Sequence, residues 1–267
     1  MDWGASRYLT VRYERLRDTT QGTEDILPIR REGFSSDLGL PLPFGRRYRL
    51  TFEYKDEFVQ EDPPRANPAV AYLNRSLAAV YTYDGLHYRG DTSIVTNGDF
   101  LRLRFENGGA LNALNTTIFD LGGVDFRRNE LRYSRFLALS NDNHVIGLNY
   151  HGGAYVSPRE RNILEGEEYS VGGGTTVRGY ADVEPFAVGP KLLVLNAEYR
   201  YIFNDYWQGV LFYDWGNAYT EPRVSVKDFQ SGYGAGARIS TPVGALRLDL
   251  ARGSQWWIFH FGIGATF

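Results

Sequence analysis

Four histidines, His87, His144, His151 and His260, are the side chains of this sequence best suited to general-base chemistry. A hydrolase holds such a base within hydrogen-bond reach of its nucleophile. His87 and His144 lie near short turns, and no His-x-Ser pair stands beside a polar cluster on an apolar strand face. The sequence therefore predicts that the protein is not an enzyme.

The sequence lacks the residues that metal, cofactor and nucleic-acid sites require. The chain has no cysteine, which excludes disulfides and thiolate metal sites. The remaining candidate ligands show no metal-ligand spacing. The 29 basic and 32 acidic residues give a formal net charge of −3, and no basic block is present. We therefore predict no metal, no cofactor and no nucleic-acid partner.

A glycine-rich run is the most distinctive local motif: Val171-Gly-Gly-Gly-Thr-Thr-Val-Arg-Gly-Tyr180. It is not a phosphate-binding loop, because it lacks the Lys-Ser/Thr ending and no helical pattern follows it. Taken alone, it favours a flexible surface loop. Its meaning depends on the elements around it.

Those elements are β-strands, because the dominant hydrophobic period is two. In the final segment, Phe259, Phe261 and Ile263 share one face, and His260 and Gly262 share the other. The same alternation occurs near residues 46–56, 99–107 and 244–251. Helical patterns of useful length are missing, so the sequence predicts an all-β protein.

The chemistry of the two strand faces indicates a membrane barrel. The chain has 16 Phe, 19 Tyr and 5 Trp, and the apolar faces carry many of them near strand ends. The opposite faces combine Gly with Arg, Asp and Glu. An apolar outside with aromatic girdles and a charged interior is typical of transmembrane β-barrels. No run of 18 apolar residues is present, so no transmembrane helix is predicted. A large soluble β protein is the alternative.

The alternation predicts an antiparallel up-and-down barrel of about twelve strands, an even number as single-chain bacterial barrels require. Short turns alternate with longer loops near 17–32, 57–69, 157–190 and 219–230. Both termini are then expected on the periplasmic side. The twelve predicted spans are 7–16, 33–42, 46–56, 70–83, 99–107, 127–139, 145–156, 191–203, 208–218, 231–241, 244–251 and 256–267.

Several motifs follow the glycine-rich run in a characteristic order. They are Glu198-Tyr-Arg-Tyr201, Phe212-Tyr-Asp-Trp-Gly216, Gly234-Ala-Gly-Ala-Arg238, Thr241-Pro242 and Leu246-Arg-Leu-Asp249. This succession resembles the barrel of the BamA/TamA-type outer-membrane assembly and translocation superfamily, the bacterial surface antigen family of Gram-negative bacteria. The resemblance covers about residues 80–267, and residues 1–70 show only barrel periodicity.

The resemblance implies that the loop 157–190 folds back into the barrel. Its tip is Val177, Arg178, Gly179 and Tyr180, and the family's partner motif is Phe212, Asp214 and Gly216. Alternation independently places Phe212, Asp214 and Gly216 inside, with Gly216 leaving room for the loop backbone. Arg178 would need a carboxylate partner there, and Glu198 is a second candidate. A functional latch and a mere structural prop predict the same residues.

The C-terminal strand carries a second motif. Its residues His260, Gly262, Gly264, Ala265 and Phe267 follow the polar–Gly–aromatic ending of outer-membrane barrels and are similar to the signal that the assembly machinery recognises. Glycines thin one face, and a terminal aromatic residue anchors at the interface. This motif indicates location only.

The chain departs from the family pattern in two ways. The family's barrels have sixteen strands and are preceded by periplasmic POTRA repeats, whereas twelve strands and no POTRA repeat are expected here. We expect residues 1–267 to form a single, shortened outer-membrane barrel domain, with 157–190 as its internal loop.

The expected function is insertion or translocation of other proteins at the bacterial outer membrane, through a seam between the first and last strands. The expected partners are membrane lipid, client outer-membrane or secreted proteins, and periplasmic proteins or lipoproteins. A passive narrow pore, or an anchor for another domain, remains the alternative. A twelve-stranded outer-membrane phospholipase is disfavoured, because its Ser–His–Asn site is missing from the apolar face.

Overall fold

A computed structural model describes residues 8–21, 26–61, 71–113, 116–139, 142–157, 167–182, 184–220, 225–241 and 244–264. These residues form strands, turns and one short 3-10 helix, η1 (Val226–Asp228). Within these ranges, no helix has both the length and the hydropathy needed to cross a membrane.

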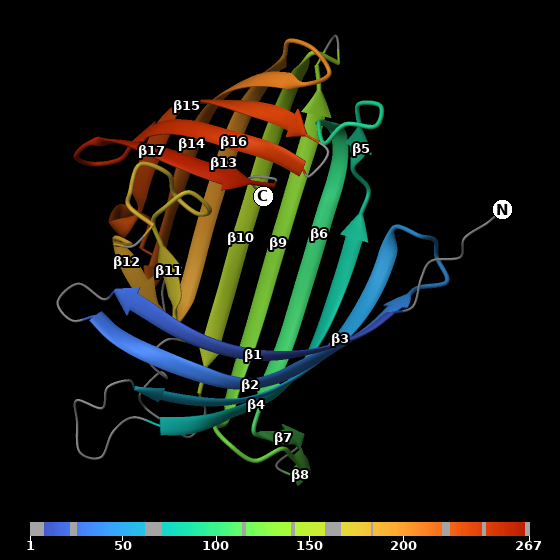
Figure 1. The fold of residues 1–267 in the computed structure, drawn as a ribbon, viewed down its shortest axis with the longest axis vertical. Coiled ribbons are helices and arrows are strands. Elements are labelled where there is room, and N and C mark those ends of the chain that lie inside the picture. Colours follow the sequence, from blue (N-terminus) through green and yellow to red (C-terminus); the bar gives the residue numbers. More distant parts are fainter. Residues whose placement is uncertain are drawn as a thin grey trace. The chain divides into compact units, whose positions relative to one another are not determined.

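Twelve strands follow one another in chain order in a single large sheet, as predicted, and β5 adds to it by pairing with β6 (Figure 1). Each predicted span overlaps one of these twelve strands, so the prediction of an antiparallel, up-and-down β fold is confirmed. The strands are β1 (Tyr8–Gln21), β2 (Ile26–Pro41), β3 (Tyr48–Glu61), β4 (Ala71–Asp84), β6 (Val95–Gly108), β9 (Phe126–Ala138), β10 (His144–Val156), β13 (Lys191–Ile202), β14 (Trp207–Tyr219), β15 (Gln230–Thr241), β16 (Gly244–Arg252) and β17 (Trp257–Ile263).

The first hairpin is longer than predicted. The loop expected near 17–32 is mostly strand, because β1 and β2 stay paired from Tyr8 opposite Gly39 to Gln21 opposite Ile26. Backbone pairing does not require apolar side chains, so this polar part of the hairpin gave no hydrophobic alternation to detect.

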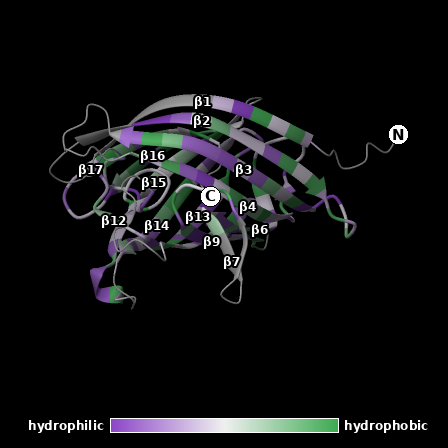
Figure 2. Cartoon of the chain, turned by 90° about the horizontal axis from the view of Figure 1, so that it is seen from below, coloured by the Kyte–Doolittle hydropathy of each residue, from purple (hydrophilic) through white to green (hydrophobic). Residues whose placement is uncertain are grey.

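Alternating burial explains why these segments are strands. Along β14, Leu211 and Tyr213 are exposed, whereas Phe212 and Asp214 are buried. Figure 2 shows the corresponding bands of polar and apolar residues along the strands. The sheet therefore presents one apolar face and one face with polar and charged groups.

The chain divides into two compact units. The first comprises Met1–Tyr83, Arg102–Glu130 and Ala154–Glu168, and the second comprises Asp84–Leu101, Leu131–Gly153 and Tyr169–Phe267. Within the first unit, the rings of Phe126 and Tyr155 stack with their centroids 5.2 Å apart. Within the second unit, Ile94, Phe136 and Ile202 belong to one buried apolar cluster.

Short strands off the twelve-strand path make local pairings. β5 (His87–Tyr88) pairs with β6, and β7 (Ala110–Ala113) pairs with β8 (Thr116–Asp120). β11 (Tyr169–Val171) pairs with β12 (Ala187–Gly189), and residues 172–186 between them include the rest of the glycine-rich run. In Figure 1, this small hairpin lies beside β13 and β14, which it contacts.

Candidate functional site

The hairpin base and two buried valines hold the glycine-rich loop against the sheet. Val171 and Val177 are fully buried and pack with Leu192 and Val194 of β13. Between them the chain turns sharply, and the Gly173 N–H donates to the Val177 carbonyl oxygen at 3.0 Å. Gly173 has φ 109°, which favours glycine there. We call the sheet face that this loop contacts the loop-covered face, and the opposite one the open face.

Arg178 makes a bidentate pair with Asp214 on β14. Its Nε and Nη2 groups donate to the two carboxylate oxygens at 2.6 and 2.7 Å. Its backbone N–H donates a third bond to Asp214 at 3.0 Å. The guanidinium carbon lies 3.5 Å from the centroid of the Phe212 ring. The structure thus brings together the two sequence motifs that were expected to meet.

Two further carboxylates surround the same guanidinium. Arg178 Nη1 lies 2.7 Å from Glu198 Oε1 on β13 and 3.4 Å from Asp249 Oδ2 on β16. The side chains of all four residues are at most 1% exposed. Burial opposes the charge of Arg178, but Asp214, Glu198 and Asp249 outweigh it and raise its pKa above the ordinary value.

Other arginines complete the charge balance. Arg238 Nη1 donates to Asp249 at 2.6 Å, and Arg200 Nη2 lies 2.6 Å from Glu198. We call Arg178, Glu198, Arg200, Asp214, Arg238 and Asp249 the Arg178 cluster. Buried charges are tolerated only when they are paired and hydrogen-bonded, so the cluster holds as a unit.

Gly232 and Gly253 allow close approach of the loop backbone, in addition to the expected Gly216. A Cβ at Gly216 would meet the Leu193 carbonyl oxygen at 2.8 Å, and this atom belongs to the neighbouring strand. A Cβ at Gly232 would instead lie 1.7 Å from the Arg178 carbonyl oxygen, and one at Gly253 would lie 2.6 Å from that of Gly179. The role expected for Gly216 stays a prediction, because strand alternation defines the face of a residue and not the backbone above that face.

The last strand also contacts the loop. The Gly179 N–H donates to His260 Nε2 at 3.1 Å, and His260 is 3% exposed. Gly179 has φ 93°, a conformation suited to glycine. Of the predicted terminal signal, Gly262 borders the guanidinium of Arg247, which donates to the Gly174 carbonyl oxygen at 2.8 Å. Gly264 has φ 103°, and Ala265 and Phe267 lie outside the described residues.

Tyr180 completes the loop tip. Its hydroxyl donates to the Ser231 carbonyl oxygen at 3.2 Å, and its ring lies 4.4 Å from that of Phe186. Asn196 was not predicted as a site residue, although it lies two positions before Glu198 on the same face. Its amide donates to Asp214 at 2.9 Å and to the Thr176 carbonyl oxygen at 2.7 Å.

The start of the loop has its own charge cluster, which sequence reasoning missed. Glu167 is 5% exposed and accepts from Arg31 and Arg128 at 2.6 Å each and from Asn74 at 3.1 Å. We call these four residues the Glu167 cluster. Burial opposes the ionisation of Glu167, but Arg31, Lys55 and Arg128 outweigh it and lower its pKa to about 2. A single glutamate in a loop gives no sequence signal.

Comparison with known families agrees with this geometry. Residues 3–267 match the Omp85 superfamily domain. The chain belongs to the Omp85 superfamily. This confirms the resemblance found in the motif order, because BamA-type barrels are among the solved structures that this Omp85 chain matches.

Two solved structures share the fold. BamA from Haemophilus ducreyi lacking POTRA domains 1–3 superposes with a TM-score of 0.68 at 14% identity, covering 94% of this chain and 56% of that one. CdiB from Acinetobacter baumannii superposes with a TM-score of 0.55 at 13% identity, covering 92% and 44%. The large sheet of this Omp85 chain therefore has the β-barrel fold of its superfamily.

A plant protein is similar in sequence. The chloroplastic outer envelope protein 80 of Arabidopsis thaliana is 31% identical over 143 residues, which cover 49% of this chain and 17% of that protein. The chain thus spans less than a fifth of this relative and about half of the two solved chains.

Further polar groups of this Omp85 domain are paired with one another. Arg104 pairs with Glu53 and Glu106. His144 Nδ1 lies 2.5 Å from the Tyr199 hydroxyl oxygen. In the described part of the chain, no three His, Cys, Asp or Glu side chains are grouped to hold a metal ion.

Proposed function

We propose that this chain is an integral β-barrel of the bacterial outer membrane that inserts or translocates other proteins. The observation that supports this most is the bidentate pair of Arg178 and Asp214, at 2.6 and 2.7 Å, in a chain of the Omp85 superfamily. Residues 1–267 would act as one barrel domain with both termini on the periplasmic side. Its partners would be membrane lipid, client proteins and periplasmic proteins or lipoproteins.

The inserted loop couples several strands. Through Arg178 it contacts Glu198 of β13, Asp214 of β14 and Asp249 of β16, and through Gly179 it contacts His260 of β17. Release of the loop would remove all of these contacts together. The loop therefore acts as a latch on this part of the sheet, and no covalent chemistry is involved.

The proposed route for a client uses the ends of the strand order. β1 and β17 are the first and last strands in that order. A strand edge offers unpaired N–H and C=O groups, to which a client strand adds by β-augmentation. Gly262 in β17 and Gly264 directly after it offer no side chain for packing at this edge. A client strand would pair first with the edge of β17, and the loop would control how readily that edge is released.

The test is client folding in liposomes. A slowly folding outer-membrane barrel is added to vesicles with and without this protein, and folded client is detected by its heat-sensitive gel mobility. We expect the unmodified protein to accelerate folding of the client and R178A to accelerate it less. No acceleration by the unmodified protein would contradict the proposal.

A cross-linking arm tests the route itself. The chain has no cysteine, so an introduced Phe261→Cys on β17 can be paired with a cysteine in the client's terminal strand. The matched control is Leu211→Cys in the middle of the sheet, since Phe261 and Leu211 are 62% and 58% exposed. Equal cross-linking of the client to Phe261→Cys and to Leu211→Cys would contradict addition of the client strand at β17.

A passive pore or membrane anchor is the second candidate. Dense pairing of buried charges in the Arg178 cluster favours the anchor over the pore, because such a network obstructs an interior and requires no movement. If the protein does not accelerate client folding, this second candidate is supported instead. Single-channel conductance that is the same in R178A and the unmodified protein would then identify a pore.

A further inference from the structure

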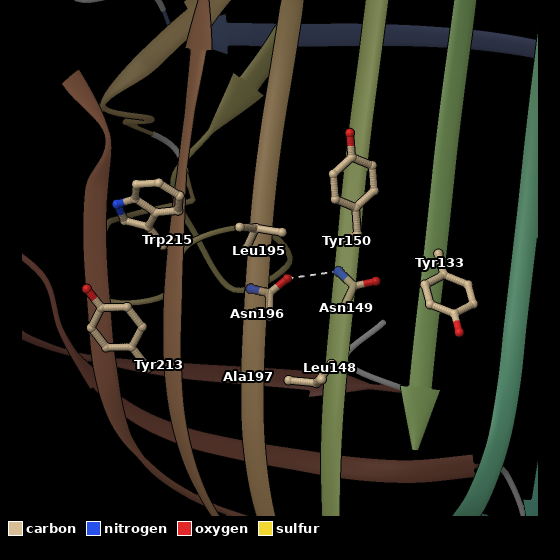
Figure 3. Close-up of a pocket in the computed structure, with 9 residues that line it drawn as sticks. All are labelled: Tyr133, Leu148, Asn149, Tyr150, Leu195, Asn196, Ala197, Tyr213 and Trp215. Atoms are coloured by element: carbon tan, nitrogen blue, oxygen red, sulfur yellow. Dashed lines mark hydrogen bonds between the residues drawn. The ribbon is translucent and has the colours of Figure 1, made fainter. Parts of the chain in front are cut away.

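The open face of the second unit carries an apolar groove of about 420 Å³ (Figure 3). Four neighbouring strands, β9, β10, β13 and β14, form it. Tyr133 and Tyr150 line one side, Tyr213 and Trp215 line the other, and Leu148 and Ala197 lie between them. The small side chain of Ala197 leaves the space that the surrounding aromatic rings enclose.

The groove opens away from the inserted loop. Tyr133, Leu148 and Tyr213 are 40%, 45% and 51% exposed. Behind them, the buried Asn149 donates to Asn196 at 2.8 Å on the loop-covered face. The sheet therefore closes the floor of the groove, and a ligand would enter from the open face only.

A charged pair stands at the Tyr133 edge of this groove. The Tyr133 hydroxyl donates to Asp99 Oδ1 at 2.6 Å, and Arg135 Nη1 donates to Asp99 Oδ2. The Arg135 and Asp99 side chains are 41% and 24% exposed. Charges on the lipid-facing side of a barrel cost stability, and this cost falls toward the interfaces, where lipid headgroups lie. Packing alone therefore does not explain why Arg135 and Asp99 lie on the open face.

We propose that this site binds one zwitterionic phospholipid with a primary ammonium headgroup. An acyl chain would occupy the apolar groove. The phosphate would accept hydrogen bonds from Arg135, whose fork geometry suits phosphate oxygens. The ammonium would donate to Asp99, which a quaternary headgroup cannot do. The inference rests on the proposed membrane location, but not on client insertion.

Trp215 provides the probe, because it lines the groove. The other four of the five tryptophans are changed to Phe. The protein is then reconstituted in vesicles that contain a fixed fraction of brominated phosphatidylethanolamine, phosphatidylcholine or phosphatidylglycerol. Bromine quenches Trp fluorescence on contact. Phosphatidylethanolamine is expected to be enriched at Trp215 about fivefold over either other lipid.

Two variants test the recognition. R135Q should abolish the headgroup preference, because Arg135 pairs with Asp99 at the edge of the groove. R252Q should keep it, because Arg252 is exposed at the end of β16, which is not one of the four strands that form the groove. Ala197→Phe should fill the groove and reduce quenching by all three lipids. Heat-sensitive gel mobility verifies that each variant is folded.

Equal quenching by the three lipids would overturn the inference and indicate bulk lipid only. If R135Q does not fold, the outcome is still decided by quenching with the three lipids in the protein that retains Arg135, and by Ala197→Phe. No client is present in this experiment, so failure of the proposed insertion activity leaves the result unaffected.

Discussion

Arg178 and Asp214 are joined by three hydrogen bonds, two from the guanidinium at 2.6 and 2.7 Å and one from the Arg178 backbone N–H at 3.0 Å. The backbone bond matters because it fixes the loop itself and not only the long side chain. This relationship links residues 36 positions apart in the chain, and the first prediction tests it directly.

Replacing Arg178 tests the latch directly. R178A leaves Asp214, Glu198 and Asp249 buried with less compensation and should lower the free energy of unfolding by about 3–5 kcal/mol. R178K keeps the charge but loses the bidentate fork, so an intermediate loss is expected. Heat-sensitive mobility in detergent measures both, with the exposed R252A as the matched control. Wild-type heat resistance and client folding in either Arg178 variant would show that the latch idea is wrong.

Gly232 tests the close approach of the loop. In G232A the new Cβ would clash with the Arg178 carbonyl oxygen, which lies 1.7 Å from its ideal position. The loop must move, at a cost of about 1–3 kcal/mol. G209A is the control on the neighbouring strand, since its Cβ would meet only the Phe203 ring at 3.1 Å. Limited proteolysis of the loop should distinguish the two variants, and equal protection in both would exclude the approach at Gly232.

His260 tests the contact between the loop and the last strand. H260A leaves the Gly179 N–H without its acceptor, which costs about 1–3 kcal/mol when the donor stays buried. Hydrogen exchange at Gly179 should become faster. H260Q supplies a carbonyl oxygen in place of Nε2 and should restore part of the protection. Unchanged exchange in H260A would mean that this bond does not hold the loop.

The lowered pKa of Glu167 predicts that acid destabilises the native contacts of the loop. Its pKa of about 2 is lower than that of an unfolded glutamate, so its ionised form stabilises the native state above about pH 4.5. This contribution should be lost as the pH falls from about 4.5 toward 2. Protease cleavage of the loop across this range measures the loss. E167Q should remove the pH-dependent part of the loop's protection from cleavage. A cleavage profile in E167Q identical to that of the unmodified protein would contradict the role of the Glu167 cluster.

The terminal residue tests the predicted C-terminal signal. Deletion of Phe267 removes the aromatic end of the motif and should impair assembly of the barrel in cells by reducing its level in the outer-membrane fraction. Deletion of an exposed residue in a loop provides the control. Unchanged outer-membrane levels after deletion of Phe267 would remove the support for this signal.

The strands and the family were accessible from the sequence because both rest on local or ordered patterns. Alternation along β14 separates Leu211 and Tyr213 from Phe212 and Asp214, and burial follows the same period. Motif order identified the superfamily before any contact was known. Carboxylates on the inner face also indicated partners for Arg178, because a buried guanidinium needs them.

Other contacts depended on tertiary structure. Alternation assigns a residue to a face, but it does not say which backbone lies above that face. Only the folded loop puts Gly232 under Arg178 and His260 under Gly179, and only it buries Glu167 among Arg31, Asn74 and Arg128. The groove beside Arg135 likewise requires four strands in register. The sequence by itself determined the period, the faces and the family, whereas contacts between distant segments were decided by strand register and loop insertion, which no local pattern encodes.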